Sequence, residues 1–567
     1  MCLWTLRLSL VALLLGGCAA LAPARRSVEQ PVSQIAATAH PLATRAALDM
    51  LERGGGPIDA AIAAQMVLGL VEPQSSGIGG GSLLLVWDAA QRKLSSFDGL
   101  AVAPSQTTAG LALDSDGTAL KPQDVQRGGR SAGVPGTLAV LKQAHERFGR
   151  LRWAALFEPA IRLAESGYPL APYLHGILSQ PGAAEQHREF HPLFFDDQRA
   201  LLPAGTTIRN PAYAKTLRKI AAGGHDGHLA QGGAADLVAA LQRGFRASLI
   251  TENDLLSYRA VEREPVCGPF LAYSICVMAP PSFGGIAVLQ ILQMTQARSP
   301  GRSDFDDPDF AHIYVEAGKL AQADRRKYVG DPDFVPVPTA KLVEPDYLKR
   351  RSREIDASRA NAKPAAGDVD GKMAAWQPDA SDPLSATSQI AIVDRDGNAL
   401  SMTTTNNLNF GSRILVNGFV LNNALTNFSP APRPGEMIAN HMQPGKRPAT
   451  SMVPTIVLDA QGVPVVVGGS AGGGQIVDYV SQSLIEMLAN GRTPGEGLRR
   501  GHVSTATPGK VELEQGTQAE GLAAMLREKG HTVEVTRLPS GLAFVARRGS
   551  GWIGAADPRR DGAADGR

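Results

Sequence analysis

Cysteine, aromatic residues and net charge are all scarce in this sequence. Of its 567 residues, four are cysteine and 5% are aromatic, and 56 Lys and Arg residues nearly balance 54 Asp and Glu residues, leaving a formal charge of +2. A chain without long runs of positive charge has no surface suited to a nucleic-acid backbone. Two of the four cysteines lie in the first 18 residues, so a metal site of the paired CxxC type is excluded by count. We therefore expect no nucleic-acid partner and no metal.

The apolar run at the start of the chain is too short to span a bilayer. Arg7 is followed by an apolar stretch over residues 8–15, and then by small residues that lead into Cys18. This order is typical of a secretory signal, whereas a membrane-spanning helix needs about 20 apolar residues. The sequence predicts a signal peptide over residues 1–17, a linker over residues 18–32, and an exported, periplasmic protein.

The end of this signal also resembles the bacterial lipobox, in which the cysteine is lipidated and becomes the first residue of the mature protein. Leu15, Gly16, Gly17 and Cys18 carry the resemblance, and Ala19 after the cysteine implies the outer membrane. The protein would then touch the membrane only through a lipid on Cys18. An ordinary cleaved signal with an incidental cysteine is the alternative.

The other two cysteines, Cys267 and Cys276, are the ones that can belong to the folded body. The run VCGPFLAYSIC predicts a short hairpin, and a turn between Leu271 and Ala272 would place the two cysteines opposite each other. Export permits a disulfide there, and two buried free thiols are the alternative.

Glycine and proline, by contrast, are abundant, with 61 and 39 residues, and 44% of the chain is apolar. These residues follow no collagen-like period and so indicate a turn-rich globular protein. At about 100–200 residues per domain, the length allows two to four domains or one large one.

Two helices and a buried strand are predicted near the start of the mature chain. Apolar spacing predicts a helix over residues 40–53, and an Ala-rich interior helix runs from Pro57 to Leu70. The glycine-rich run VEPQSSGIGGG, residues 71–81, then leads into a strand that ends near Asp88. A dinucleotide loop follows a strand and precedes a helix, which is the opposite order, so we expect no nucleotide. Residues 132–260 are mostly helical in pattern.

Two further segments are polar. His187 and His191, with Glu189 between them, have the i, i+4 spacing that could place two metal ligands on one helix face, but no third ligand is visible and Pro192 follows at once. A solvated polar stretch is therefore the favoured interpretation. Residues 341–386 have no periodicity and are low in branched apolar residues. We expect this segment to be mobile and exposed.

The stretch after this segment carries the candidate chemistry. Residues 390–393 and 400–405 are predicted strands, and Asp396-Gly397 is a strong hairpin turn. The hairpin would bring Thr387 and Ser388 beside residues 404–406, which are Thr, Thr and Asn. Taken alone, a Thr-rich strand is simply a good β-strand.

This stretch is similar to the signature around the nucleophile of the γ-glutamyltransferase (γ-glutamyltranspeptidase) family. Residues that match its pattern are Thr387, Asp396-Gly397-Asn398, Thr403, Thr405, Asn407 and Phe410-Gly411. Ordered matches extend along most of the chain: HPLA at 40–43, VEPQSSGIGGG at 71–81, VPGT at 134–137, DLLSYRAVER at 254–263, ADR and GDPDF within 323–334, LNN at 421–423, GKRPATSMVPT at 445–455, GGSAGGG at 468–474 and ADPR at 556–559.

The resemblance implies an α+β fold, a four-layer αββα sandwich of the N-terminal nucleophile hydrolase type built from two autoprocessed pieces. The cut would fall between Ala386 and Thr387, giving a large subunit of residues 33–386 and a small subunit of residues 387–567. Thr387 would be the nucleophile, and its new α-amino group, with an ordinary pKa of about 7.7–8.0, would be the base. No cofactor is implied.

The remaining family roles fall on other matched residues. Thr405 would hold the new amino terminus, and Gly472 and Gly473 would form the oxyanion pair, where missing side chains let N–H groups approach closely. The substrate-binding positions are Asn407, Thr450 and Ser451. A plain flexible loop is the alternative for the GGSAGGG run.

Three substrate-contact positions depart from the family pattern. Leu100 replaces the arginine that binds a substrate carboxylate, and Ala424 and Asn427 replace the glutamine and aspartate that bind its ammonium. Hydrogen bonds to charged groups contribute about 1.5–3 kcal/mol each, so a glutamyl specificity does not simply carry over. Arg413 or Arg447 would have to supply a cation from another direction. The family histidine two residues after the nucleophile is Gln389.

Three functions therefore compete. The first is an autoprocessing γ-glutamyltransferase-like enzyme that transfers a γ-glutamyl or related acyl group from a small-molecule amide such as glutathione to water or an amine. The second is an acylase for another amide, as in the related cephalosporin acylases. The third is a catalytically silent binding lipoprotein, which retention of Thr387, Thr405 and the glycine pair disfavours.

Overall fold

The computed structural model describes residues 26–567 apart from residues 109, 112, 114–117, 119, 244, 370–372, 374, 382–385 and 431–434. The predicted signal peptide and Cys18 lie outside the described residues. Among the helices that are described, none is both long enough and apolar enough to cross a membrane.

Two seven-stranded sheets form the centre of the molecule. The first sheet has the order β21-β2-β10-β11-β3-β4-β7. Its strands are β2 (Ile35–Thr38), β3 (Gly81–Asp88), β4 (Lys93–Gly99), β7 (Val261–Arg263), β10 (Ser388–Val393), β11 (Ala399–Thr405) and β21 (Ala563–Gly566). The second sheet has the order β1-β20-β19-β15-β14-β9-β8. Its strands are β1 (Ser27–Val32), β8 (Val266–Phe270), β9 (Tyr273–Val277), β14 (Thr455–Leu458), β15 (Pro464–Gly469), β19 (Ala543–Arg548) and β20 (Gly551–Ala556).

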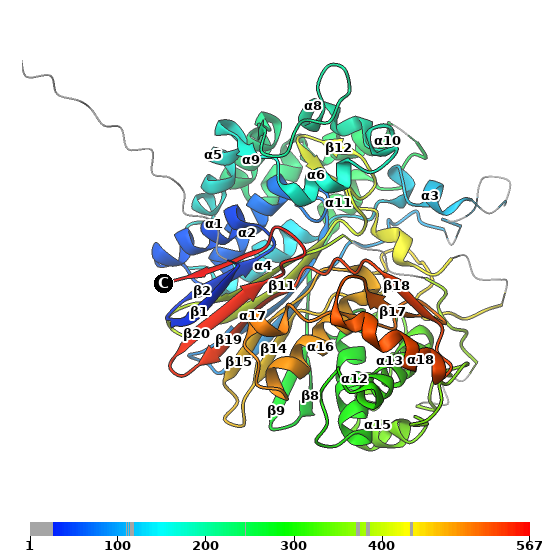
Figure 1. Cartoon of the computed structure of the whole chain (residues 1–567). Coiled ribbons are helices and arrows are strands. Elements are labelled where there is room, and N and C mark those ends of the chain that lie inside the picture. The colour runs from blue at the N-terminus through cyan, green and yellow to red at the C-terminus, as the bar shows by residue number, and fades with distance from the viewer. Residues whose placement is uncertain are drawn as a thin grey trace, which may run out of the picture.

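Helices cover the outer face of each sheet (Figure 1). On the side of the first sheet these are α1 (Pro41–Glu52), α2 (Pro57–Val71), α4 (Thr137–Phe148), α5 (Glu158–Ser166) and α9 (Pro211–His228). On the side of the second sheet they are α12 (Phe283–Arg298), α13 (Pro308–Tyr328), α15 (Pro345–Ser352) and α16 (Ile476–Leu488).

Short elements complete the chain. The strands are β5 (Tyr168–Pro169), β6 (Thr207–Ile208), β12 (Leu415–Val416), β13 (Phe419–Val420), β16 (Val503–Ser504), β17 (Val511–Glu514) and β18 (Val533–Thr536). The helices are α3 (Pro122–Val125), α6 (Pro172–Leu178), α7 (Ala183–Gln186), α8 (His191–Phe194), α10 (Ala234–Gln242), α11 (Glu252–Ser257), α14 (Thr339–Leu342), α17 (Pro494–Gly497) and α18 (Ala523–Glu528).

The alternation of side chains along β10 shows how the layers pack. Ile390 and Ile392 belong to the core shared with α1 and α2, whereas Ala391 and Val393 belong to the core that includes Val467 of β15. Because successive strand residues point to opposite faces, β10 has helices on one side and the second sheet on the other. The predicted four-layer αββα sandwich is confirmed.

Helix α2 is buried along its whole length, as its all-apolar pattern predicts. Pro57 occupies the first turn, and the Asp59 carboxylate accepts a hydrogen bond from Gly56 N at 2.8 Å, so the amino end is capped despite the absence of a side chain at the N-cap. The helix ends at Val71 and delivers the following loop, residues 72–80, into the interior.

Both predicted hairpins are present. In β10 and β11, Ser388 pairs with Thr404. In β8 and β9, Cys267 pairs with Cys276 and the two form a disulfide. The alternative of two free thiols is therefore wrong.

Each sheet contains strands from both sides of the predicted cut. In the first sheet, β10 pairs with β2 on one side and with β11 on the other, and β11 pairs with β3. In the second sheet, β14 pairs with β9, and β1 pairs with β20. A break before Thr387 would leave two pieces that share both sheets.

The prediction of exposure is wrong for part of residues 341–386 and for His187, whereas residues 356–359 are exposed as predicted. Within residues 341–386, Tyr347 and Leu348 of α15 are buried, and Arg351 pairs with buried Asp324 at 3.0 Å, because this segment covers α12 and α13. His187 is also buried rather than solvated, since its ring packs on Phe410 with centroids 4.5 Å apart.

The two histidines of the weighed metal motif do not share a helix. Helix α7 ends at Gln186, before His187, and α8 begins at His191. The mostly helical character of residues 132–260 is confirmed.

Candidate active site

Thr387 lies immediately before β10, beside the end of β11. It is 3% exposed and Ala386 is 1% exposed, so the predicted cleavage bond is inside the protein. The hydroxyl of Thr387 donates to the hydroxyl oxygen of Thr405 at 3.4 Å. Thr405 in turn donates to the carbonyl oxygen of Ala386. A chain of hydroxyl groups therefore connects the candidate nucleophile to the carbonyl of the bond that precedes it.

The Thr405 hydroxyl is held in place by a third contact. It accepts a hydrogen bond from Asn407 N at 2.7 Å. Asn407 has a φ of 80°, a left-handed conformation that Asn tolerates better than most residues. Because the Asn407 N–H occupies one side of the Thr405 oxygen, the hydroxyl proton of Thr405 points toward the Ala386 carbonyl.

The side chain of Asn407 presents an acceptor to the site. Its Nδ2 donates to the carbonyl of Asn423 at 3.2 Å and to the hydroxyl of Thr426 at 2.8 Å. A carbonyl cannot donate, so the contact with Asn423 fixes the orientation of the amide. Both amide protons are used, and Oδ1 is the group that remains for a ligand.

A buried arginine holds the other side of Thr387. Arg560 Nη1 donates to the Thr387 carbonyl oxygen at 3.1 Å, and its Nη2 donates to the Pro539 carbonyl at 2.8 Å. The same guanidinium lies against Gly541, whose N–H and C=O both pair with Ala471. Through Gly541 and Arg560, the loop after β15 is therefore connected to Thr387.

Gly472 and Gly473 follow Ala471 at the amino end of α16. Their φ values are 138° and 65°, and a Cβ on Gly472 would lie 2.4 Å from Tyr479 Cε2, so only glycine fits there. In the described part of the chain, neither glycine N–H has a hydrogen-bond acceptor. Free N–H groups at a helix start are suited to bind negative charge.

Thr450 and Ser451 lie next to this loop. The Ser451 hydroxyl donates to the carbonyl of Gly473 at 2.6 Å, which uses its only proton. Thr450 Oγ1 accepts from Met452 N at 3.3 Å and retains its own proton. Of these two residues, Thr450 is the one that has a donor left for a ligand.

The loop of residues 72–80 is a part of the site that the sequence did not identify. Its motif VEPQSSGIGGG signalled only a resemblance, yet Glu72 Oε2 accepts from the Ser388 hydroxyl at 2.9 Å. Burial raises the pKa of the Glu72 carboxyl to about 7, and the contacts with Arg560 and Ser388 oppose that rise. The Glu72 carboxyl, a titratable group, therefore contacts the residue that follows Thr387.

The departures from the family pattern remove charge from the site. Leu100 is buried at 4% exposure, and its carbonyl accepts from the hydroxyl of Tyr258 at 2.7 Å. Gln389 lies between the sheets, where its amide bonds to Ser401 and Thr403, and it fits against Gly469. These residues pack and offer no cation.

Of the two arginines considered as substitutes, Arg447 is engaged by other groups. It pairs with buried Asp98 at 3.4 Å and donates to the Arg259 carbonyl at 2.9 Å. Arg413 lines a cavity of about 220 Å³ together with Arg127 and Glu189.

Replacing Asp98 by Asn should destabilise the protein by about 3–5 kcal/mol, because the buried guanidinium of Arg447 would lose its carboxylate and that of Arg263 would lose one of its three. Asp98 is fully buried and contacts Arg263 at 2.8 Å as well as Arg447. The measurement is denaturant unfolding. Asp333→Asn is the matched control, since Asp333 pairs with the same Arg263 at 2.9 Å but is 49% exposed; it should cost less than about 1 kcal/mol. Equal losses in both variants would contradict the expectation.

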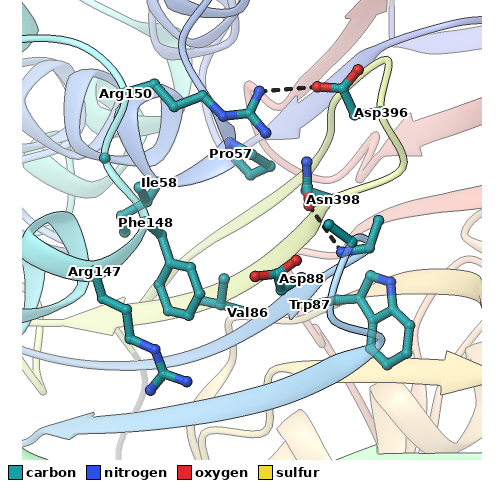
Figure 2. A pocket seen from close by; sticks show the side chains of 13 residues that line it. Pro57, Ile58, Val86, Trp87, Asp88, Arg147, Phe148, Arg150, Asp396 and Asn398 are labelled. Atoms are coloured by element: carbon teal, nitrogen blue, oxygen red, sulfur yellow. Dashed lines mark hydrogen bonds and ion pairs between the residues drawn. The ribbon is translucent and has the colours of Figure 1, made fainter.

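A cavity of about 560 Å³ lies at the opposite end of the first sheet (Figure 2). Its lining includes Asp88 at the end of β3 and Asn398 just before β11, and Figure 2 shows Arg150 paired with Asp396 at its edge. Strand β11 runs from this cavity to Thr405, which at about 3.4 Å per residue is about 20 Å. The cavity is therefore separate from the candidate nucleophile.

One group of residues in the described ranges has a composition suited to a metal, namely His312, Glu316 and His531. Its ring nitrogens already form a hydrogen-bonded chain: His531 Nε2 contacts His312 Nδ1 at 2.8 Å, and His312 Nε2 contacts the Asp356 carbonyl at 2.7 Å. The ammonium of Lys319 lies 3.0 Å from His531 Nδ1. Placing a cation there would require that chain to break.

The chain is similar to known proteins over most of its length. The sequence profile of the family described as gamma-glutamyltranspeptidase matches residues 43–566. The chain is 33% identical over 543 residues to the glutathione hydrolase proenzyme of Bacillus subtilis (strain 168), covering 94% of this chain and 91% of that protein. It is 32% identical over 536 residues to the acylase ACY 1 proenzyme of Pseudomonas sp. (strain SE83), covering 93% and 92%.

A solved structure is similar over almost the whole chain. The crystal structure of cephalosporin acylase from Bacillus halodurans superimposes with a TM-score of 0.81 at 26% identity, covering 98% of this chain and 99% of that one. The sequence comparisons therefore include an acylase as well as a glutathione hydrolase, and the structural comparison includes an acylase.

Proposed function

Because this chain belongs to the gamma-glutamyltranspeptidase family of enzymes, we propose that it cuts itself between Ala386 and Thr387 and then transfers an acyl group from a small-molecule amide through Thr387. The observation that carries the proposal is the hydroxyl chain from Thr387 through Thr405 to the Ala386 carbonyl. Proenzymes among the relatives support the order of events, with cleavage before turnover.

In the cleavage step, Thr387 Oγ1 attacks the carbonyl carbon of Ala386. Thr405 donates to the carbonyl oxygen as negative charge develops there. The C–N bond breaks and the nitrogen takes the proton lost by the hydroxyl, so the peptide becomes an ester and a free α-amine. Water then hydrolyses the ester, which releases the Ala386 carboxylate and restores the Thr387 hydroxyl.

In turnover, the freed α-amine of Thr387 accepts the proton of its own hydroxyl as Oγ1 attacks the substrate amide. Gly472 and Gly473 present their free N–H groups to the developing oxyanion. The leaving amine takes the proton and departs, and the acyl group stays as an ester on Thr387. Attack by water completes hydrolysis, and attack by an amine completes transfer.

The contacts around the site favour the acylase alternative over a strict γ-glutamyl specificity. Leu100 brings no cation, and Asn407 and Ser451 have already used the protons that would bind a carboxylate. Ala424 and Asn427 bring no negative charge for an ammonium. The acyl group that fits is one recognised without the charged head group of an amino acid.

A substrate comparison tests this specificity. On the processed protein, γ-glutamyl p-nitroanilide should have a kcat/KM no higher than that of glutaryl or butyryl p-nitroanilide, because each charged contact that is absent forfeits about 1.5–3 kcal/mol. The release of p-nitroaniline is followed by absorbance. A tenfold or greater preference for the γ-glutamyl compound would show that the head group is recognised after all.

We also propose that the protein is exported and that a lipid on Cys18 holds it at the outer membrane, as the order of charge, apolar run and cysteine at the start of the chain suggests. A Cys18→Ala variant should then move from the membrane fraction to the soluble periplasmic fraction. Release of the unchanged protein into that soluble fraction would refute the anchor.

A further inference from the structure

The loop of residues 72–80 packs directly against the turn that follows β11. Its Ser75 carbonyl accepts from Asn406 N at 2.9 Å, and its Pro73 carbonyl accepts from Asn406 Nδ2 at 3.1 Å. A Cβ on Gly80 would lie 2.2 Å from the Thr405 carbonyl oxygen, so the loop approaches this strand as closely as glycine permits. The loop and the strand that bears Thr405 are thus held in one fixed arrangement.

Two side chains of the same loop converge on Ser388, the residue after the nucleophile. Glu72 Oε2 accepts from the Ser388 hydroxyl at 2.9 Å, and the Ser76 hydroxyl donates to Ser388 at 3.0 Å. Glu72 is 1% exposed, and Ser76 and Ser388 are fully buried. Among the described residues, no partner is found for Glu72 Oε1.

The Glu72 carboxyl is buried with one of its oxygens unpaired, which is unfavourable for the fold. Its interaction with buried Arg560 and its hydrogen bond with Ser388 offset that cost. Arg560 and Ser388 are also the groups that hold the chain at Thr387, so the acid at position 72 acts on the residues that position the new chain end.

After cleavage the new chain end at Thr387 has to be held in place, and Glu72 is located where it can contribute. Before the cut, Thr387 is held by peptide bonds on both sides; after it, Thr387 is a chain end, and chain ends fray unless they are tied down. Arg560 ties the Thr387 carbonyl at 3.1 Å. On the next residue, two side chains of the large piece hold the Ser388 hydroxyl: Glu72 accepts its proton, and Ser76 donates to its oxygen.

We propose that Glu72 is a positioning residue: through the hydroxyl of Ser388 it holds the new chain end so that the Thr387 hydroxyl and α-amine stay at Thr405 during turnover. The inference rests on the proposed function, since it assumes that Thr387 becomes the reacting chain end. Glu72 lies in the VEPQ portion of the 71–81 motif, so this portion contributes to turnover by positioning Thr387. Glu72 itself does not contact the substrate.

The test compares Glu72→Leu with Glu72→Gln in the processed enzyme. Leu has a similar size but no acceptor, whereas Gln keeps an acceptor oxygen for Ser388. We expect kcat to fall about 10- to 100-fold in Glu72→Leu with KM changed less than twofold, because a small misplacement of a reacting group costs about that much. Glu72→Gln should retain kcat within about fivefold. The thermal midpoints of both variants are measured as well, so that kcat is compared only between folded enzymes.

A second pair of variants examines the same link from the other end. Ser388→Ala should lower kcat as Glu72→Leu does, and Ser388→Thr, which keeps the hydroxyl, should restore it. Ser76→Ala is the matched control, because it removes a neighbouring hydroxyl from Ser388 and leaves the link to Glu72. Precursor conversion should slow less than turnover does, because the peptide bond to Ala386 still anchors Thr387 before the cut.

The inference would be overturned by a Glu72→Leu enzyme with kcat within threefold of the parent, or by a Glu72→Gln enzyme that loses as much as Glu72→Leu. A KM that rises by the same factor as kcat falls would also overturn it, since that pattern belongs to substrate binding. Thr387→Ala is run in parallel: if that variant matures, the proposed function fails whatever the Glu72 variants do, and if it stays uncut, their outcome decides on Glu72 alone.

Discussion

A Thr387→Ala variant is expected to remain a single uncut chain with no detectable acyl transfer, while the parent separates into two bands on a denaturing gel. Alanine removes the hydroxyl that attacks the Ala386 carbonyl. Among the described residues of β10, no other hydroxyl forms a hydrogen bond with the Thr405 hydroxyl. Loss of a covalent nucleophile lowers kcat by about 10⁴-fold or more.

Thr387→Ser is the control, because it keeps a hydroxyl on the same carbon and should still cut. Amino-terminal sequencing of the smaller band should begin at residue 387. Cleavage of the Ala variant at the same bond, or a small band that starts elsewhere, would rule out self-processing by Thr387.

A Thr405→Val variant is expected to slow precursor conversion by about 10²–10³-fold. Valine has nearly the same shape and suits a strand, so the change removes the hydroxyl and little else. The Ala386 carbonyl loses its donor at the point where charge develops, and removal of one such donor typically has an effect of that size. Asn407 N also loses its acceptor, which costs about 1–3 kcal/mol for a buried donor.

The half-time of conversion of purified precursor, followed on gels, measures this effect. Thr404→Val is the matched control: its side chain points to the other face of β11, where it accepts from Ser82 at 2.9 Å. It should convert within about threefold of the parent rate. Equal slowing in the two variants would mean that loss of any hydroxyl at this strand end disturbs the fold, and the specific role of Thr405 would be lost.

What could be predicted from the sequence was mostly local. Thr387 and Thr405 are 18 residues apart and are joined by a recognisable Asp-Gly turn, so their adjacency followed from hairpin geometry. The disulfide register followed in the same way from a short hairpin. The four-layer fold came from the resemblance, because no periodicity specifies how two sheets stack.

The contacts that the sequence did not reveal join distant segments. Glu72 and Ser388 are 316 residues apart, and Arg560 and Thr387 are 173 residues apart. A lone acid after an apolar helix, or one more arginine near the end of the chain, has no local pattern that points to a partner. His187 was expected to be solvated for the same reason, since Phe410, which covers it, lies far along the chain.

The alternation of strands from both sides of residue 387 also ties the proposed cleavage to folding. Thr405 and Arg560 contact Thr387, and Glu72 contacts Ser388. These groups come from segments far apart in the sequence, so they come together only in the folded chain. If the bond before Thr387 is cut as proposed, the scission would act as a checkpoint: misassembled chains would stay inert, and chains that have reached the native topology would become active.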